Sequence, residues 1–208
     1  MPPDEISRRA VIAGAALVPV AALTAAAQTT TPSSALTSAL SESQLRILAA
    51  FVDGIIPKDE LSPSASECGV TEYINRSLGD YLAAEKPAFI EGLEQTDAFA
   101  QRTENRPFVD LTADKQDVVL TAMDNGTAEG FANAKVFFNR ARRLTLEGMF
   151  GDPYYGGNRN FAGWDLIKYP GPRLATSADD QRMGVEIKPY HHSAYGAAGE
   201  HSGVEHGH

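Results

Sequence analysis

Hydrophobic residues recur along this chain at the three- and four-residue spacing of amphipathic α-helices. The first such pattern begins at Ser41, whose spacing to Gln44 is that of a capping box, and it ends before Pro57. Four more helical patterns cover residues 70–82, 87–101, 112–125 and 134–150. Because no run alternates apolar and polar residues over the length of a strand, the sequence predicts an all-α fold, a compact bundle of about five helices.

The apolar face of each pattern predicts the core. These positions are Leu45, Leu48, Val52, Ile55, Ile56, Val70, Tyr73, Ile74, Leu78, Tyr81 or Leu82, Phe89, Ile90, Leu93, Ala100, Val118, Val119, Ala122, Met123, Phe137, Phe138, Ala141, Leu144, Thr145 and Gly148. We interpret residues 58–67 as a solvated crossover loop, although loops of that length are often functional. Residues 107–111 predict a short extended connector.

The last helical pattern runs into a loop rich in both glycine and aromatic residues. Six of the 18 glycines fall within residues 148–171, interleaved with Phe150, Tyr154, Tyr155, Phe161, Trp164 and Tyr169. We expect Gly151 to end the helix in the left-handed conformation, because Pro153 cannot continue it. Since large rings need firm neighbours, the loop is predicted to be ordered. Such rings serve either as interface anchors or as a cap over a small core.

This stretch resembles the C-terminal signature of the gluconate 2-dehydrogenase subunit 3 family, in the combination GDPYYGGN, GW and YPG. The matching positions are Leu144, Thr145, Gly151, Asp152, Pro153, Tyr155, Gly156, Gly157, Asn158, Gly163, Trp164, Tyr169, Pro170 and Gly171. Lys168 stands where a glycine is expected. An earlier stretch, IIPKDELSPSASECGV, also resembles the family, so the likeness covers about residues 41–173.

The resemblance implies a non-catalytic small subunit of an FAD-dependent sugar, sugar-acid or glycoside dehydrogenase complex. FAD is then expected in a partner flavoprotein of the GMC type and haem c in a partner cytochrome, with no cofactor-binding residue in this chain. The expected partner-docking residues are Arg140, Arg143, Asp152, Tyr154, Tyr155, Asn158, Arg159, Trp164 and Tyr169.

The N-terminus has the pattern of a twin-arginine export signal. Arg8 and Arg9 precede an uncharged, alanine-rich stretch that ends at a small-residue cleavage site, Ala25 to Ala27. We predict a signal peptide over residues 1–27 and a flexible linker over 28–40, although the apolar stretch is near the minimum for an uncleaved membrane anchor. The Tat translocase carries folded cargo, so the signal predicts export of the flavoprotein to the periplasm, where the complex is peripheral to the inner membrane.

The composition of the chain excludes several classes of partner and of catalytic site. A net charge of −9 and a pI near 5.0 argue against nucleic acid as a partner. One cysteine, Cys68, excludes an intrachain disulfide, and we expect it to be a semi-buried small hydrophobe. Residues 41–189 hold no histidine, which excludes Ser-His-Asp and Cys-His arrangements there. A carboxylate pair remains as a catalytic alternative, drawn from Asp53, Asp59, Glu60, Asp110, Asp114, Asp117, Asp124 and Asp152.

Residues 174–208 are predicted to be an extended tail, disordered from Tyr190, and they hold all five histidines: His191, His192, His201, His206 and His208. Two rival functions therefore accompany the accessory-subunit hypothesis. One is a free-standing exported carbohydrate-active enzyme that uses the carboxylate pair. The other is a periplasmic metal-binding protein that uses the histidine tail, although the spacing of the histidines selects no coordination geometry.

Overall fold

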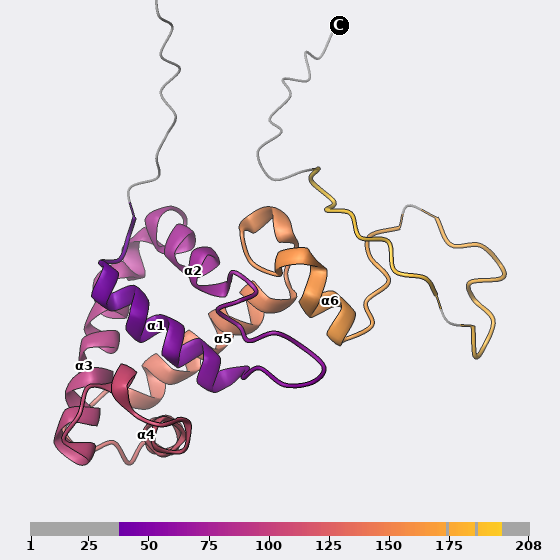
Figure 1. Ribbon diagram of the computed structural model, residues 1–208. Helices are drawn as coiled ribbons and strands as arrows, with labels where there is room; N and C mark the ends of the chain where they lie inside the picture. Colours follow the sequence, from indigo (N-terminus) through magenta and orange to yellow (C-terminus); the bar gives the residue numbers. More distant parts are fainter. Residues whose placement is uncertain (1–37, 174, 186, 197–208) are drawn as a thin grey trace, which may run out of the picture. The chain divides into compact units, whose positions relative to one another are not determined.

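The computed structural model describes residues 38–173, 175–185 and 187–196 (Figure 1). The described residues contain helices and no strand, which confirms the all-α prediction. The helices are α1 (Glu42–Ile55), α2 (Val70–Gly79), α3 (Lys86–Glu104), α4 (Ala113–Asn125), α5 (Ala134–Phe150) and α6 (Ala162–Leu166). Short 3₁₀ turns lie at Ala83–Glu85, Phe108–Asp110, Pro153–Tyr155 and Arg159–Phe161.

The ends of several helices are set by capping residues that can be recognised in the sequence. The Ser41 hydroxyl accepts from Gln44 N at 3.3 Å, and the Gln44 side chain accepts from Ser41 N at 2.9 Å, so the predicted capping box is present. Pro87 lies in the first turn of α3, where its missing N–H costs nothing. Gly126 ends α4 in the left-handed conformation, with φ of 74°.

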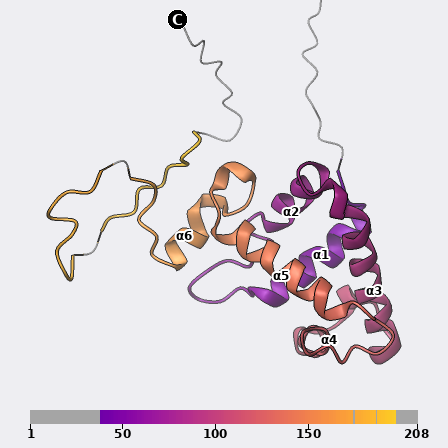
Figure 2. The ribbon, with the colours of Figure 1, turned by 180° about the vertical axis from the view of Figure 1, so that it is seen from behind.

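Helix α5 is the element that most of the others share. It packs against α1, α2, α3, α4 and α6. Figure 2, which views the molecule from behind, shows α5 crossing the other helices. Phe137 is the centre of a ring cluster, with ring centroids 5.3 to 6.2 Å from those of Phe89, Phe51 and Phe131. Every predicted core position on α5 is buried, from Phe137 to Gly148. The helical period of the sequence therefore places this face correctly.

One predicted core position is wrong, because Val118 is 60% exposed. Of the two alternatives Tyr81 and Leu82, Leu82 is the buried one and Tyr81 is 63% exposed. On α4 the buried residues are Val119, Leu120 and Met123, so the face of the helix that meets the core does not include Val118. Phe51, which the sequence reasoning missed, is fully buried.

The two connectors also differ from expectation. In the loop after α1, Lys58 to Leu61 are exposed, but Ser62, Ser64 and Ala65 are buried, so only its first part is solvated. Asp53 fixes the buried part by accepting from Ser66 N at 2.8 Å and Ser66 Oγ at 2.7 Å. Residues 107–111 contain a 3₁₀ turn instead of the predicted extended connector, since buried Phe108 donates its N–H to Asp97 Oδ1 at 2.8 Å.

The predicted export signal, with Arg8 and Arg9, and most of the predicted linker lie outside the described residues. Among the helices that the structure describes, none combines the length and the hydrophobicity needed to cross a bilayer.

Candidate docking surface

The C-terminal segment, residues 151–171, leaves α5 in a way that the sequence did not predict. Gly151 has φ of −70° and ψ of 177°, which is extended and not left-handed. Its N–H still donates to Glu147 O at 2.8 Å, and a Cβ at Gly151 would lie 2.5 Å from that oxygen. Glycine is therefore needed at this position for close approach to the helix end. Asp152 begins the next turn, since its Oδ1 accepts from Tyr154 N at 2.9 Å.

Asn158 is the internal staple of this segment. Its side chain is fully buried, Nδ2 donates to Gly151 O at 2.8 Å, and Oδ1 accepts from Gly163 N at 2.8 Å. With φ of 46°, Asn158 also turns the chain through the left-handed region, which asparagine tolerates better than most residues. One side chain thus joins the end of α5 to the start of α6.

Glycines bring the segment against the backbone of α5. A Cβ at Gly157 would lie 2.1 Å from Gly148 O, and one at Gly163 would lie 1.8 Å from Met149 O. Trp164 fills the space beside this contact, because it is 4% exposed and its Nε1 donates to Phe150 O at 3.0 Å. The C-terminal segment is ordered, as predicted. Trp164, the one tryptophan in the sequence, is buried within this segment.

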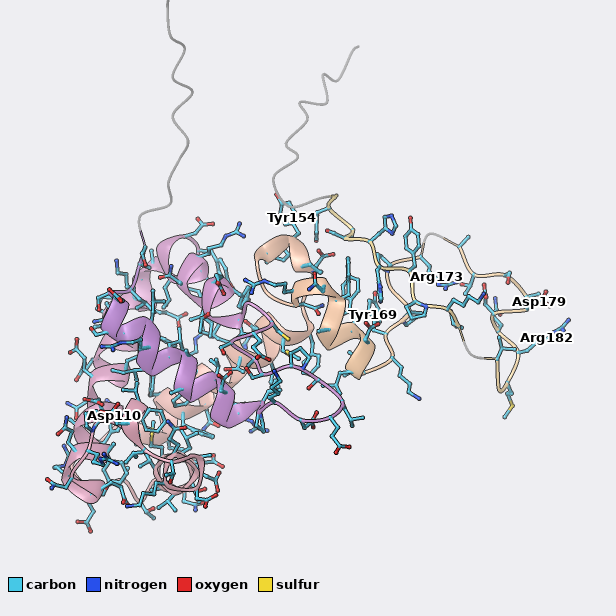
Figure 3. All side chains as sticks on the ribbon, viewed as in Figure 1. Asp110, Tyr154, Tyr169, Arg173, Asp179 and Arg182 are labelled. Atoms are coloured by element: carbon cyan, nitrogen blue, oxygen red, sulfur yellow. The ribbon has the colours of Figure 1, made fainter. Side chains whose placement is uncertain are left out.

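The rings of Tyr154, Tyr155 and Tyr169 lie on the outside of the segment. Tyr155 is 45% exposed and Tyr169 is 39% exposed. The ring of Tyr169 meets Trp164 edge-on at 4.9 Å, while Tyr154 and Tyr155 meet each other edge-on at 5.3 Å. Figure 3 labels Tyr154 and Tyr169, which come from different parts of the segment. These rings are the part of the aromatic loop that solvent can reach.

A groove of about 540 Å³, which we call the α5 groove, opens beside Tyr155. Tyr73 from α2 forms one wall, and Leu146, which is 39% exposed, forms part of the other. The remaining lining residues are Glu147, Gly148, Phe150, Gly151, Asp152 and Gly157. The groove is therefore built by α2, the last turns of α5 and the C-terminal segment together.

A hydrogen-bonded network runs along the edge of the α5 groove. Arg143 Nε donates to Glu147 Oε1 at 2.8 Å, and the Tyr73 hydroxyl donates to Glu147 Oε2 at 3.2 Å. The Tyr73 and Tyr81 hydroxyls lie 3.0 Å apart. Burial, the Tyr81 hydroxyl and the Glu147 carboxylate all raise the pKa of Tyr73 above its ordinary value. Tyr73 therefore stays neutral and can donate to Glu147.

The described part of the tail returns to the C-terminal segment. Residues 190–196, which we call the tail strap, bind it at several points. Tyr190 N donates to Pro170 O at 3.0 Å, and His191 Nε2 lies 2.7 Å from Asp165 Oδ1. Ala194 N donates to Asp152 Oδ2 at 2.9 Å. The sequence predicts disorder from Tyr190, whereas the structure holds residues 190–196 against the folded C-terminal segment, whose partners for them are distant in the sequence.

The match to a family model covers residues 42–171 and has the description gluconate 2-dehydrogenase subunit 3. It spans all six α-helices that the structure describes and the whole C-terminal segment. The chain belongs to this family. Neither the curated proteins nor the solved structures that were compared with it contain a significant match.

The gluconate 2-dehydrogenase subunit 3 domain distributes the nine predicted docking residues over several environments. Asn158 and Trp164 are buried within the segment. Asp152 is bonded to the backbone on both sides. Of the predicted set, only Asp152 and Tyr155 line the α5 groove, while Tyr154 and Tyr169 lie on other parts of the segment. No finding tests their role in docking, which stays a prediction.

The three arginines that were predicted to dock the partner each contact a different part of the protein. Arg143 belongs to the network at the α5 groove, and Arg159 reaches back to Glu67 O at 3.2 Å and Glu72 Oε1 at 3.4 Å. Arg140 lines a second groove of about 710 Å³ between α3 and α5, where its Nη2 donates to Glu85 Oε1 at 2.8 Å. Its Nε lies 2.7 Å from Glu85 Oε2 without the geometry of a hydrogen bond.

Leu146 lines the α5 groove, and the Tyr81 hydroxyl lies 3.0 Å from the hydroxyl of Tyr73 in the groove wall. The sequence reasoning missed both as surface residues. The signal for Leu146 was available, because it is an apolar residue off the buried face of α5, between Thr145 and Glu147.

Cys68 and three of the candidate carboxylates have contacts within the fold. Cys68 is 1% exposed, and burial raises the pKa of its thiol, as fits a small hydrophobe. Asp53, Asp59 and Asp152 each accept backbone N–H groups. In residues 38–173, 175–185 and 187–196, no three His, Cys, Asp or Glu side chains are grouped to hold a metal ion.

Proposed function

We propose that this chain is the non-catalytic small subunit of an exported FAD-dependent sugar or sugar-acid dehydrogenase complex. The observation that carries the proposal is the family match over residues 42–171, which includes every described helix. FAD belongs to a GMC-type partner flavoprotein, and haem c belongs to a partner cytochrome that takes the electrons. This chain supplies assembly, stability and the export signal for that flavoprotein.

The flavoprotein docks at the α5 groove in this proposal. An exposed tyrosine and an exposed leucine, Tyr155 and Leu146, lie at a groove of about 540 Å³, and aromatic anchors in pockets are typical of interface hot spots. The groove is preorganised, because Asn158 and the close glycine contacts fix the backbone behind it. A rigid surface loses little conformational entropy on binding, which favours stable association.

The docking test compares the two grooves. Leu146→Arg and Tyr155→Arg, made singly, each place one positive charge in the α5 groove. Val136→Arg places one positive charge at the groove between α3 and α5, where Val136 is 70% exposed. We expect both variants of the α5 groove to lose the co-purifying flavoprotein and Val136→Arg to keep it, with melting temperatures close to wild type. The reverse result would move the docking site to the second groove.

Trp164 was predicted to dock the partner, but Trp164→Ala is a poor test of docking. Trp164 is 4% exposed and bonded to Phe150 O, so its removal perturbs the segment itself. Exposed substitutions separate docking from folding.

The export test replaces Arg8 and Arg9 by lysine in cells that make this chain and the flavoprotein. We expect both proteins to stay in the cytoplasm, because the flavoprotein is proposed to have no signal of its own. A flavoprotein that reaches the periplasm unaided would contradict the carrier role.

The complex itself is identified by its colour. The chain, purified with its native partners, should show the absorption bands of flavin and haem, whereas the isolated chain should be colourless. Sugar oxidation by the isolated colourless chain would contradict a non-catalytic subunit.

A further inference from the structure

The tail strap, residues 190–196, contacts the outside of the C-terminal segment at three separate positions. Ala194 N donates to Asp152 Oδ2 at 2.9 Å. Beside it, the Tyr195 ring lies 5.3 Å from the Tyr154 ring and 5.6 Å from the Tyr155 ring. At the other end, the His191 ring stacks flat on Phe161 at 4.9 Å and 6°. The strap thus contributes the backbone N–H of Ala194 and the rings of His191 and Tyr195. The C-terminal segment contributes the Asp152 carboxylate and the rings of Tyr154, Tyr155 and Phe161.

The segment side of this contact is built independently of the strap. Asp152 is oriented by its own bond to Tyr154 N at 2.9 Å. Phe161 is held at φ of 61°, which is unusual for an aromatic residue, and packs on buried Trp164 at 5.3 Å. Asp152 and Phe161 therefore have contacts within the C-terminal segment that do not depend on the strap.

The strap is bound shallowly. Tyr195 is 60% exposed and the His191 side chain is 41% exposed. A hollow of about 270 Å³ remains between the strap and the segment, lined by Pro153, Tyr154 and Phe161 on one side and by His191, His192 and Ser193 on the other. An occupant that leaves such a hollow fills its site incompletely. A segment with better complementarity can displace it.

We propose that Asp152, Tyr154, Tyr155 and Phe161 form a peptide-binding site that the chain's own tail strap occupies. The strap defines the chemistry of the ligand, a segment that turns at its Ala194 and Tyr195 positions and gives one backbone N–H to Asp152 and an adjacent aromatic ring to Tyr154 and Tyr155. The strap is then a built-in competitor for that site. If the proposed function holds, the displacing segment belongs to the partner flavoprotein.

The experiment uses the full chain and a synthetic peptide of residues 188–196, KPYHHSAYG, labelled for fluorescence anisotropy. The variant His191→Ala with Tyr195→Ala releases the strap, and Met183→Ala is the matched control, because Met183 is a fully exposed tail residue. A tethered strap competes at a local concentration in the millimolar range. We therefore expect the released variant to bind the peptide about tenfold more tightly than wild type, and the control to match wild type.

Two further arms locate the site. Tyr155→Ala in the released variant should weaken peptide binding about two- to tenfold, and alanine at the Tyr195 position of the peptide should do the same. Hydrogen exchange should show protection of the Ala194 amide in wild type and its loss in the released variant. Equal peptide binding by wild type and released chain, or none by a released chain that melts like wild type, would overturn the proposal.

The outcomes are separable from those of the proposed function. Failure to recover a dehydrogenase with the chain removes the accessory role and leaves peptide binding measurable. Absence of peptide binding removes the strap site and leaves co-purification measurable.

Discussion

Helices α1 to α5 are held together by apolar side chains, whereas the C-terminal segment, residues 151–171, is held by backbone atoms. In the helices, residues such as Phe51, Leu48 and Leu144 are fully buried in one hydrophobic cluster. In the segment, Asn158 bonds two backbone groups, and Gly157 and Gly163 approach carbonyl oxygens of α5. Apolar packing tolerates changes that conserve volume, but a backbone contact leaves no room for a methyl group. The two regions should therefore respond differently to small substitutions.

The largest effect is expected from Gly163→Ala. The new Cβ would lie 1.8 Å from Met149 O, which is backbone and cannot rotate away. We expect a loss of about 3 kcal/mol or more in the free energy of unfolding, measured by urea denaturation. Gly79→Ala is the matched control on α2, because its Cβ would meet only Ala39 Cβ at 3.7 Å. That change should be neutral or stabilising by up to about 1 kcal/mol. Equal effects at both glycines would remove the contrast.

Asn158→Ala tests the staple. It leaves the buried Gly163 N–H and the Gly151 carbonyl without their partner, so we expect a cost of about 2 to 3 kcal/mol. Asn160 shares the left-handed conformation, with φ of 57°, but is exposed. Asn160→Ala should therefore cost less than about 1 kcal/mol. The difference between the two melting curves isolates the buried hydrogen bonds, and identical curves would mean that they contribute nothing.

Leu144→Met changes the shape of a fully buried side chain on α5 while nearly conserving its volume. We expect a loss of less than about 1.5 kcal/mol, smaller than that of the single methyl group added at Gly163. Thermal denaturation followed by far-UV circular dichroism measures both. A larger loss for Leu144→Met would show that the helices tolerate change no better than the C-terminal segment.

Tyr73→Phe tests the joint between the two regions. The variant loses the hydrogen bond to Glu147, so we expect a cost of about 1 kcal/mol near pH 7. The pKa of Tyr73 is raised by burial and by its neighbours, so the folded protein keeps a proton that the unfolded chain loses above about pH 10. Its stabilising effect is present below that pH and is lost as pH rises further.

Wild type should therefore lose stability faster than Tyr73→Phe above about pH 10, by less than about 1 kcal/mol per pH unit. Denaturation curves at several alkaline pH values measure this difference. Tyr81→Phe is the control for the hydrogen bond near pH 7, since it keeps the bond between Tyr73 and Glu147. Parallel curves for wild type and Tyr73→Phe would contradict the role of the hydroxyl.

The helices were predictable where chemistry is local. Ser41 and Gln44 begin α1, Pro87 begins α3, and the apolar spacing on α5 identifies its buried face. Helix α6 was not predicted, because five residues are too few to show a helical period. Its position depends on the bond between Asn158 and Gly163 N, which joins residues on two sides of a turn.

The candidate site was predicted in its composition but not in its arrangement. The sequence identified the aromatic loop, yet it gave equal weight to Trp164, which is buried, and Tyr155, which is exposed. Val118 and Val119 show the same limit on α4, since local pattern alone does not say which of two adjacent residues faces a neighbour.

By itself, the sequence determined the helical class, most helix limits, the order of the C-terminal segment and the family resemblance, because these follow from spacing and from neighbouring residues. Only the tertiary structure decided which rings lie inside, which glycines touch the α5 backbone and where residues 190–196 bind. Those outcomes depend on contacts between residues far apart in the chain, such as Asp152 with Ala194 and Tyr73 with Glu147. The folded backbone must exist before such contacts can form.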